Sequence, residues 1–163
     1  MELPKRKQNR LMEYDYSTPN AYFITICTEN RRNLFWQDVR AIIDRPENVP
    51  LTKLGTIARQ SIMDIPKHYP MISIDRYVIM PNHIHLLLQI HTDVYGRSMI
   101  APTVSTVIRL MKGTVSKQAG FSLWQKGFHD HVVRNKDDYH EIWKYIEGNP
   151  GKWAEDKLYM DTR

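Results

Sequence analysis

The sequence predicts an α+β fold in which a four-stranded antiparallel sheet carries two helices on one face. Two observations support this prediction. Short runs rich in aromatic and β-branched residues alternate with segments of helical period along the 163 residues. The resulting order of strand, helix, strand, strand, helix, strand is the split βαβ pattern of ferredoxin-like plaits. An extra C-terminal helix follows the fourth strand and must pack on the open face or the edge of the sheet.

The first half of the chain is expected to form a strand, a helix and a second strand. YFITICT (22–28) is rich in aromatic and β-branched residues, as is typical of a strand. Apolar residues then recur at helical spacing across 54–65, with Thr52 as the N-cap. Pro66 is expected to end this helix. ISIDRYVIM (72–80) is predicted to be the second strand.

The third strand and the second helix follow. HIHLLLQI (83–90) is separated from the second strand only by Pro81 and Asn82. This tight connection predicts that the two strands are antiparallel neighbours. After a loop, apolar residues at helical spacing across 104–115 indicate the second helix.

The last predicted elements are a short strand and the extra helix. FHDHVVR (128–134) has the composition of a strand. Either Asn135 or Asp137 then caps a helix through about residue 147. Asn149-Pro150 is expected to end it, because proline disfavours a helical residue before it.

Composition predicts one domain in a reducing compartment. Hydrophobic residues make up 42% of the chain, so we expect 21–163 to form a single domain after a flexible arm at 1–20. The single cysteine, Cys27, excludes an intrachain disulfide. No signal peptide is recognisable, and no run approaches the ~20 apolar residues of a membrane helix. A cytoplasmic protein without membrane contact is therefore expected.

The basic net charge of the chain favours an acidic binding partner. The formal net charge is +5 and the pI is ≈ 9.3, a balance that is common in nucleic-acid-binding proteins. The predicted arm concentrates part of this charge in Lys5, Arg6, Lys7 and Arg10. These residues form either a solvated tail or an arm that contacts phosphates, and the sequence leaves both interpretations open.

Two histidines interrupt the apolar run of the third predicted strand. Because side chains alternate across a strand, His83 and His85 share one face and Ile84 lies on the other. Leu86 and Leu88 continue on the Ile84 side, so the histidines face away from the main core. Their Cα atoms are roughly 6.5 Å apart, close enough for two imidazoles to bind one divalent cation. Such a site needs a third ligand; without one, the pair is simply two surface histidines.

The last predicted helix carries a second candidate pair. Tyr145 and Asn149 are four residues apart and share a helix face. Beside a metal they would provide a nucleophile and a ligand on one rigid element. Tyrosine has a pKa of ~10, so it needs an electrophile that a metal has polarised. The alternative is a tyrosine that packs its ring and exposes its hydroxyl, with Asn149 as an ordinary helix-stop residue.

Taken together, these motifs resemble those of the HUH endonucleases. The best match is to the REP-associated tyrosine transposases, relatives of the small insertion-sequence transposases that have one tyrosine. PNHIHLLL is similar to the histidine–hydrophobic–histidine motif, and YIEGNP is similar to the catalytic-tyrosine motif. YFITICTENR and FHDHVVRN also resemble the family, and the resemblance covers about residues 20 to 155.

The resemblance implies metal-dependent cleavage and strand transfer of single-stranded DNA through a covalent 5′-phosphotyrosine, the chemistry of DNA transposition. His83 and His85 match the metal-binding histidines of the family, and Tyr145 matches the nucleophile. Asn149 matches the third metal ligand, where the insertion-sequence branch typically has glutamine. His131, on the fourth strand, is a reserve candidate that we expect to support the ligands indirectly. The implied cofactor is Mg²⁺ or Mn²⁺, of which Mn²⁺ accepts imidazole more readily.

The implied partner is single-stranded or hairpin DNA from a palindromic repeat. Four basic residues are candidates for phosphate contacts, and the alternative for each is a solvated charge: Arg31, Arg32, Lys112 and Arg134. The sequence allows a monomer or a homodimer. The short connection between the fourth strand and the last helix favours a tyrosine that acts in its own chain.

The sequence leaves three other interpretations open. A non-catalytic nucleic-acid-binding plait is one, because KGFHDHVV begins like an RNA-recognition strand; however, Asp130 and His131 stand where aromatic residues would stack. A metal hydrolase that uses water would need a general base, and no H-E-x-x-H motif or paired carboxylate is present. A domesticated family member that binds or nicks DNA without moving an element would keep the same residues.

Overall fold

The sheet has the predicted plait topology. The computed structural model describes residues 20–41, 43–91 and 102–159, so residues 1–19 of the predicted arm lie outside it. Its four strands are β1 (Asn20–Cys27), β2 (Ile72–Ile79), β3 (His83–Ile90) and β4 (His129–Val132). They are ordered β2-β3-β1-β4, and each neighbouring pair is antiparallel. The predicted α+β fold is therefore confirmed.

Three helices cover the sheet, and each begins at a side-chain cap. They are α1 (Lys53–His68), α2 (Val104–Ala119) and α3 (Lys136–Gly148). Thr52 accepts a hydrogen bond from the Gly55 N–H, which confirms the predicted cap of α1. Asn135, and not Asp137, caps α3, because its Oδ1 accepts from the Asp138 N–H at 2.9 Å.

The prediction that Pro66 ends the first helix is wrong by two residues. Pro66 lies inside α1, which continues to His68. A proline removes one intrahelical N–H donor, and in the last turn few bonds remain to be lost. The backbone keeps its helical bonding beyond the proline, because the Tyr69 N–H donates to the Ile65 carbonyl at 2.9 Å.

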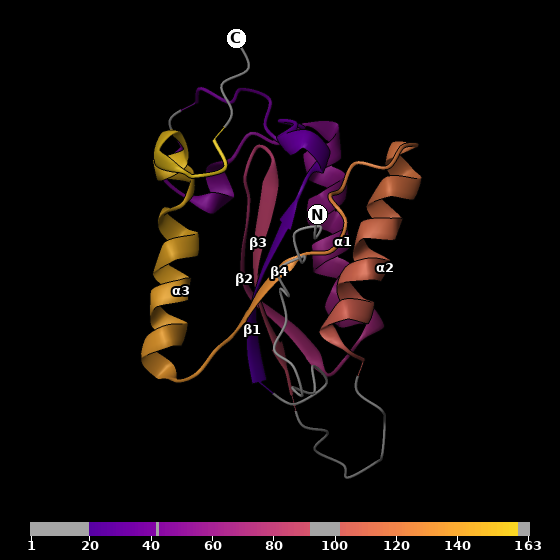
Figure 1. Cartoon of the computed structure of the whole chain (residues 1–163), viewed down its shortest axis with the longest axis vertical. Helices are drawn as coiled ribbons and strands as arrows, with labels where there is room; N and C mark the ends of the chain where they lie inside the picture. The colour runs from indigo at the N-terminus through magenta and orange to yellow at the C-terminus, as the bar shows by residue number, and fades with distance from the viewer. Residues whose placement is uncertain (1–19, 42, 92–101, 160–163) are drawn as a thin grey trace, which may run out of the picture.

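The helices form two layers with the sheet between them. Figure 1 shows α1 and α2 side by side on one face and α3 on the opposite face, as predicted for the extra helix. Ile84, Leu86 and Leu88 of β3 are fully buried on the face that α1 and α2 cover. This apolar layer is the main core of the domain.

The chain after α3 folds back over one end of the sheet. The short 3₁₀ segment η3 (Pro150–Glu155) follows α3 and buries Trp153, whose ring centroid is 6.3 Å from that of Trp36. Beyond it, the Leu158 carbonyl accepts a hydrogen bond from the Asn82 side chain at 2.7 Å. Asn82 lies in the turn between β2 and β3, so the end of the described chain is fixed beside the start of β3. No described helix has the length and apolar content needed to span a bilayer.

Candidate metal and tyrosine site

The two predicted histidines are buried side by side under α3. They lie on the face of β3 opposite the Ile84 side, and only 0% of His83 and 4% of His85 is exposed. Their ring centroids are 4.7 Å apart. Directly opposite them on β1 are Cys27 and Thr25, respectively. Alternation along one strand therefore brings both imidazoles into one enclosed space.

Each imidazole is oriented through its Nδ1 atom. His83 Nδ1 lies 2.8 Å from Asn82 Oδ1. The Asn82 amide nitrogen donates to the carbonyls of Arg31 and Leu158, so the amide oxygen faces His83 and accepts its Nδ1–H. His85 Nδ1 lies 2.8 Å from the Thr25 hydroxyl. Among the described residues, the Nε2 atoms of both histidines are buried and have no hydrogen-bond partner.

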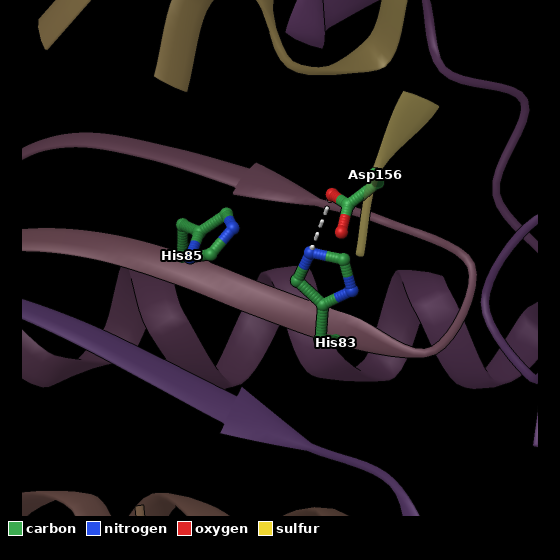
Figure 2. Close-up of side chains that lie close together, drawn as sticks. All are labelled: His83, His85 and Asp156. Carbon is green, nitrogen blue, oxygen red and sulfur yellow. Dashed lines mark ion pairs between the residues drawn. The ribbon is translucent and has the colours of Figure 1, made fainter. Parts of the chain in front are cut away.

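A carboxylate completes this cluster. Asp156 Oδ2 lies 3.5 Å from His83 Nε2, and the Asp156 side chain is 6% exposed. One ligand atom from each of His83, His85 and Asp156 lies within 4.8 Å of the others. Figure 2 shows both rings projecting from β3, with Asp156 approaching from the returning segment. Its other oxygen accepts from the Leu158 N–H at 2.8 Å, which fixes the carboxylate.

The electrostatics suit a cation. Burial holds the pKa of His85 well below its usual value, and the neighbouring His83 lowers it further, so this imidazole is neutral near pH 7. Burial raises the pKa of Asp156, but the His83 imidazole and the Leu158 N–H outweigh burial and lower its pKa overall. The cluster therefore offers an imidazole lone pair and an ionised carboxylate, a donor set that divalent cations accept.

Tyr145 lies against the same cluster. From α3 its ring makes edge contacts with His85, at 5.3 Å between centroids, and with Phe23, at 5.9 Å. The Tyr145 side chain is 48% exposed and hydrogen-bonds with the buried Asn149. Partial burial raises the pKa of Tyr145, and the Asp156 charge acts in the same direction. The Asn149 hydrogen bond lowers the pKa, but the net effect is a raised pKa.

A cleft of ≈ 610 Å³ opens onto the cluster. Tyr145, His85 and Asp156 lie on its wall together with Phe23 and Thr25 of β1. A second hollow of ≈ 380 Å³ also reaches Tyr145 and Asp156 and includes Lys144, Lys152 and Lys157. The tyrosine is therefore reachable from solvent, whereas the histidines are enclosed.

The other predicted site residues lie outside the three-residue cluster. His131 on β4 is held by Asp138, with 2.8 Å between Nε2 and Oδ2. The Lys112 ammonium donates to the carbonyls of Gln125 and Gly127, both at 2.8 Å, which ties α2 to the segment before β4. These contacts give Lys112 a structural role, and contact with DNA stays a prediction.

The three predicted arginines are exposed. Arg31 and Arg32 follow β1, and the Arg32 guanidinium lies 5.5 Å above the ring centroid of Phe121. The Arg31 carbonyl accepts from Asn82, which links this loop to the histidine pair. Arg134 precedes α3, and its N–H donates to Asp138. Contact of these arginines with DNA stays a prediction.

Sequence reasoning missed three contributors to the site: Asp156, Asn82 and Thr25. Asp156 carries no motif and reaches the histidines only because the chain folds back after α3. Asn82 could have been noticed, since it directly precedes His83. Thr25 required the register between β1 and β3, in which it lies opposite His85.

Comparison with known proteins identifies the family. The family model described as "Transposase IS200 like" matches residues 17–149. The chain belongs to this transposase family. An uncharacterized protein of Haemophilus influenzae is 31% identical over 175 aligned residues, covering 96% of this chain and 94% of that relative. A second protein of that species, named "Putative REP-associated tyrosine transposase", is 23% identical over 146 residues, covering 85% and 74% of the two chains.

A solved structure shares the fold. It is a REP-associated tyrosine transposase bound to a REP hairpin, with a TM-score of 0.57 and 20% sequence identity. The match covers 84% of this chain and 70% of that one. The predicted resemblance to REP-associated tyrosine transposases is thus confirmed, and this chain has the architecture of a DNA-processing family.

Proposed function

We propose that this protein cleaves and rejoins single-stranded DNA through a covalent 5′-phosphotyrosine at Tyr145, with the help of a divalent cation. One observation carries the proposal. The Tyr145 ring contacts His85, whose buried Nε2 has no hydrogen-bond partner among the described residues. A tyrosine beside two imidazoles whose Nε2 atoms are free to bind a cation is the arrangement that this chemistry requires.

The residues present fit a metal ion. Two enclosed nitrogen atoms, Nε2 of His83 and of His85, cost stability while they lack a hydrogen-bond partner, and a bound cation would satisfy both. A Mg²⁺ or Mn²⁺ ion there would polarise an oxygen of the scissile phosphate. Asn149, the third ligand that the sequence suggests, is buried next to Tyr145.

The tyrosine would act as the nucleophile. Its hydroxyl oxygen attacks the phosphorus, and the tyrosyl proton passes to water. The bond from phosphorus to the 3′ oxygen breaks, and that oxygen leaves as a 3′-hydroxyl after protonation. The new phosphotyrosine retains a phosphodiester bond, so a second 3′-hydroxyl can displace Tyr145 and join a new strand.

One chain contains all of these groups. Tyr145 and His85 are in ring contact within the same molecule. This contact supports a tyrosine that acts in its own chain, in agreement with the short link between β4 and α3. A monomer would then suffice for cleavage.

The substrate proposal is hairpin DNA with an adjacent single strand. It draws on the structural relative, which is bound to a REP hairpin. Exposed Arg31, Arg32 and Arg134, and Lys112 where its two carbonyl contacts permit, are the candidates for phosphate contacts. The formal charge of +5 favours such a partner.

The test is a search for the covalent intermediate. The protein is incubated with Mn²⁺ and labelled hairpin oligonucleotides taken from the DNA that flanks its gene, and products are separated on denaturing gels. We expect a protein–DNA band that is lost in Tyr145→Phe. Tyr139→Phe is the matched control on the same helix; its hydroxyl donates to Asp75 and is not part of the site, so the band should persist.

Two outcomes would contradict the proposal. Cleavage without a covalent band would make water the nucleophile. DNA that is retarded but never cleaved, equally in wild type and Tyr145→Phe, would indicate a binding protein.

A further inference from the structure

We propose that Asp156 is the third metal ligand of this site and that Asn149 instead positions Tyr145. This inference rests on the proposed function, because it concerns the same cation. It assigns a catalytic role to the segment after α3, a part of the chain that lies beyond the family match at 17–149.

The distances favour Asp156. Its Oδ2 atom is 3.5 Å from His83 Nε2, too long for a good hydrogen bond and suited to two atoms that share a cation. The three ligand atoms fit within 4.8 Å of one another, whereas typical metal–ligand bonds of about 2.0–2.2 Å place two ligand atoms at most roughly 4.4 Å apart. A small adjustment of these side chains would therefore close the site around an ion.

The carboxylate is held from both sides. Before it, the buried Trp153 packs 6.3 Å from Trp36 and 6.0 Å from His83, measured between ring centroids. After it, the Leu158 carbonyl is bonded to Asn82. The Asp156 N–H also donates to the Trp153 carbonyl at 3.0 Å. A side chain that is 94% buried by such anchors is preorganised, as metal ligands generally are.

Asn82 connects the two halves of this ligand set. Its amide oxygen orients His83, and its amide nitrogen anchors the segment that carries Asp156. One residue between β2 and β3 thus positions two ligands that are 73 residues apart in the chain (156 − 83). A surface ion pair would not need this shared support.

Asn149 already has a partner at the nucleophile. It hydrogen-bonds with Tyr145 one helical turn away. A carboxylate also binds Mg²⁺ or Mn²⁺ better than a neutral amide does, because its charge compensates that of the ion. Asp156 therefore fits the ligand role, and Asn149 fits the role of fixing the tyrosine ring.

The first experiment measures Mn²⁺ affinity of the full chain without DNA, from the electron paramagnetic resonance signal of unbound Mn²⁺. We expect Asp156→Asn to weaken binding by roughly 10-fold or more, since even residues that only support ligands contribute that much. Asn149→Ala and the control Glu155→Gln, a change in the neighbouring exposed carboxylate, should bind like wild type. Thermal melting of each variant without metal verifies folding. Asp156→Asn should fold, because the asparagine side-chain oxygen can still accept the hydrogen bond from the Leu158 N–H.

A second variant reports direct coordination. Asp156→Cys with Co²⁺ should give the near-ultraviolet charge-transfer band of a cobalt–thiolate bond. Wild type is the control for the native cysteine: Cys27 lines the same cleft, and wild type should give no such band. A ligand produces this signal, whereas a residue that acts only through His83 does not.

The outcomes separate this inference from the proposed function. Unchanged Mn²⁺ affinity in Asp156→Asn, or no cobalt band in Asp156→Cys, overturns the assignment of Asp156. Equal loss of affinity in Asn149→Ala overturns the restriction of Asn149 to the tyrosine. If His83→Ala binds Mn²⁺ like wild type, the metal site of the proposed function itself fails; if His83→Ala loses affinity and Asp156→Asn does not, only the present inference fails.

Discussion

The two faces of β3 differ in what they contribute to the protein. One face presents Ile84, Leu86 and Leu88 to α1 and α2, all fully buried in apolar surroundings. The other presents His83 and His85 to α3, equally buried but with two nitrogen atoms that lack hydrogen-bond partners among the described residues. Burial of aliphatic side chains stabilises a fold, whereas burial of unpaired polar atoms costs stability.

The difference shows how a small domain can carry the proposed site. The aliphatic face and its two helices hold the sheet together, so the opposite face can contain buried polar groups that lower stability. Asn82 and Thr25 satisfy one nitrogen on each ring and limit this cost. The stabilising core and the proposed site therefore lie on opposite faces of one sheet.

The largest effect that tests this separation is in the core. Leu86→Ala should lower the free energy of unfolding by about 2–5 kcal/mol, because it opens a cavity under α1 and α2. At a temperature where the variant is folded, Mn²⁺ affinity should be unchanged. Urea unfolding and Mn²⁺ titration measure the two quantities.

The matched control is Leu110→Ala on α2, where the side chain is 50% exposed. Its unfolding free energy should stay within about 0.5 kcal/mol of wild type. Equal destabilisation by the two variants would contradict the view that the Leu86 face is the stabilising one.

A smaller effect is expected on the histidine face. Thr25→Val keeps the shape of the side chain but removes the hydroxyl that lies 2.8 Å from His85 Nδ1. The imidazole loses its orienting partner, so Mn²⁺ affinity should fall by about 10–100-fold. Calorimetric titration with Mn²⁺ measures the change.

Thr56→Val, an exposed position on α1, makes the same chemical change away from the site and should leave affinity unaltered. If Thr25→Val also binds Mn²⁺ like wild type, then the Thr25 hydroxyl does not orient His85 for metal binding, and the prediction is wrong.

The smallest effect concerns the start of α3, which carries the tyrosine. Asp138→Asn should cost about 0.3–1 kcal/mol at pH 7, because the Asp138 carboxylate stabilises the positive end of the helix. The Arg134 N–H and the His131 hydrogen bond lower the pKa of Asp138 below its usual value. Its contribution is thus fully present above pH ~4 and is lost as pH falls through the lowered pKa.

Denaturant unfolding of wild type and Asp138→Asn across this pH range provides the measurement. The difference in unfolding free energy between wild type and Asp138→Asn should shrink as the pH falls. A difference that is constant with pH would show that the Asp138 charge does not support α3.

Most of the fold follows from local periodicity. Alternation in HIHLLLQI predicts the face that the histidines take, and the ring contact of His85 with Tyr145 of α3 agrees. It does not predict burial, because Leu87 on the histidine face is as buried as Leu86 on the core face. Thr52 and Asn135 cap their helices as their residue types predict. The predicted helix end at Pro66 is wrong because the effect of a proline depends on how many helical hydrogen bonds follow it, which local sequence does not specify.

The site is only partly predictable from the sequence. His83, His85 and Tyr145 come together because β3 places both histidines on the face that α3 covers, and α3 places Tyr145 against them. Asp156 joins them through an irregular segment whose path depends on Trp153 and on the Asn82–Leu158 hydrogen bond. Such contacts between distant segments leave no period or spacing in the sequence.

The returning segment after α3 also bears on where the functional unit ends. The family match stops at residue 149, so a fragment cut at that boundary would keep Tyr145 and both histidines. It would lack the Asp156 carboxylate, the Trp153 cover over His83 and the anchor for Asn82. A boundary drawn by family similarity therefore divides a cluster that the folded chain holds together, and truncation or fusion in this region would alter the site itself.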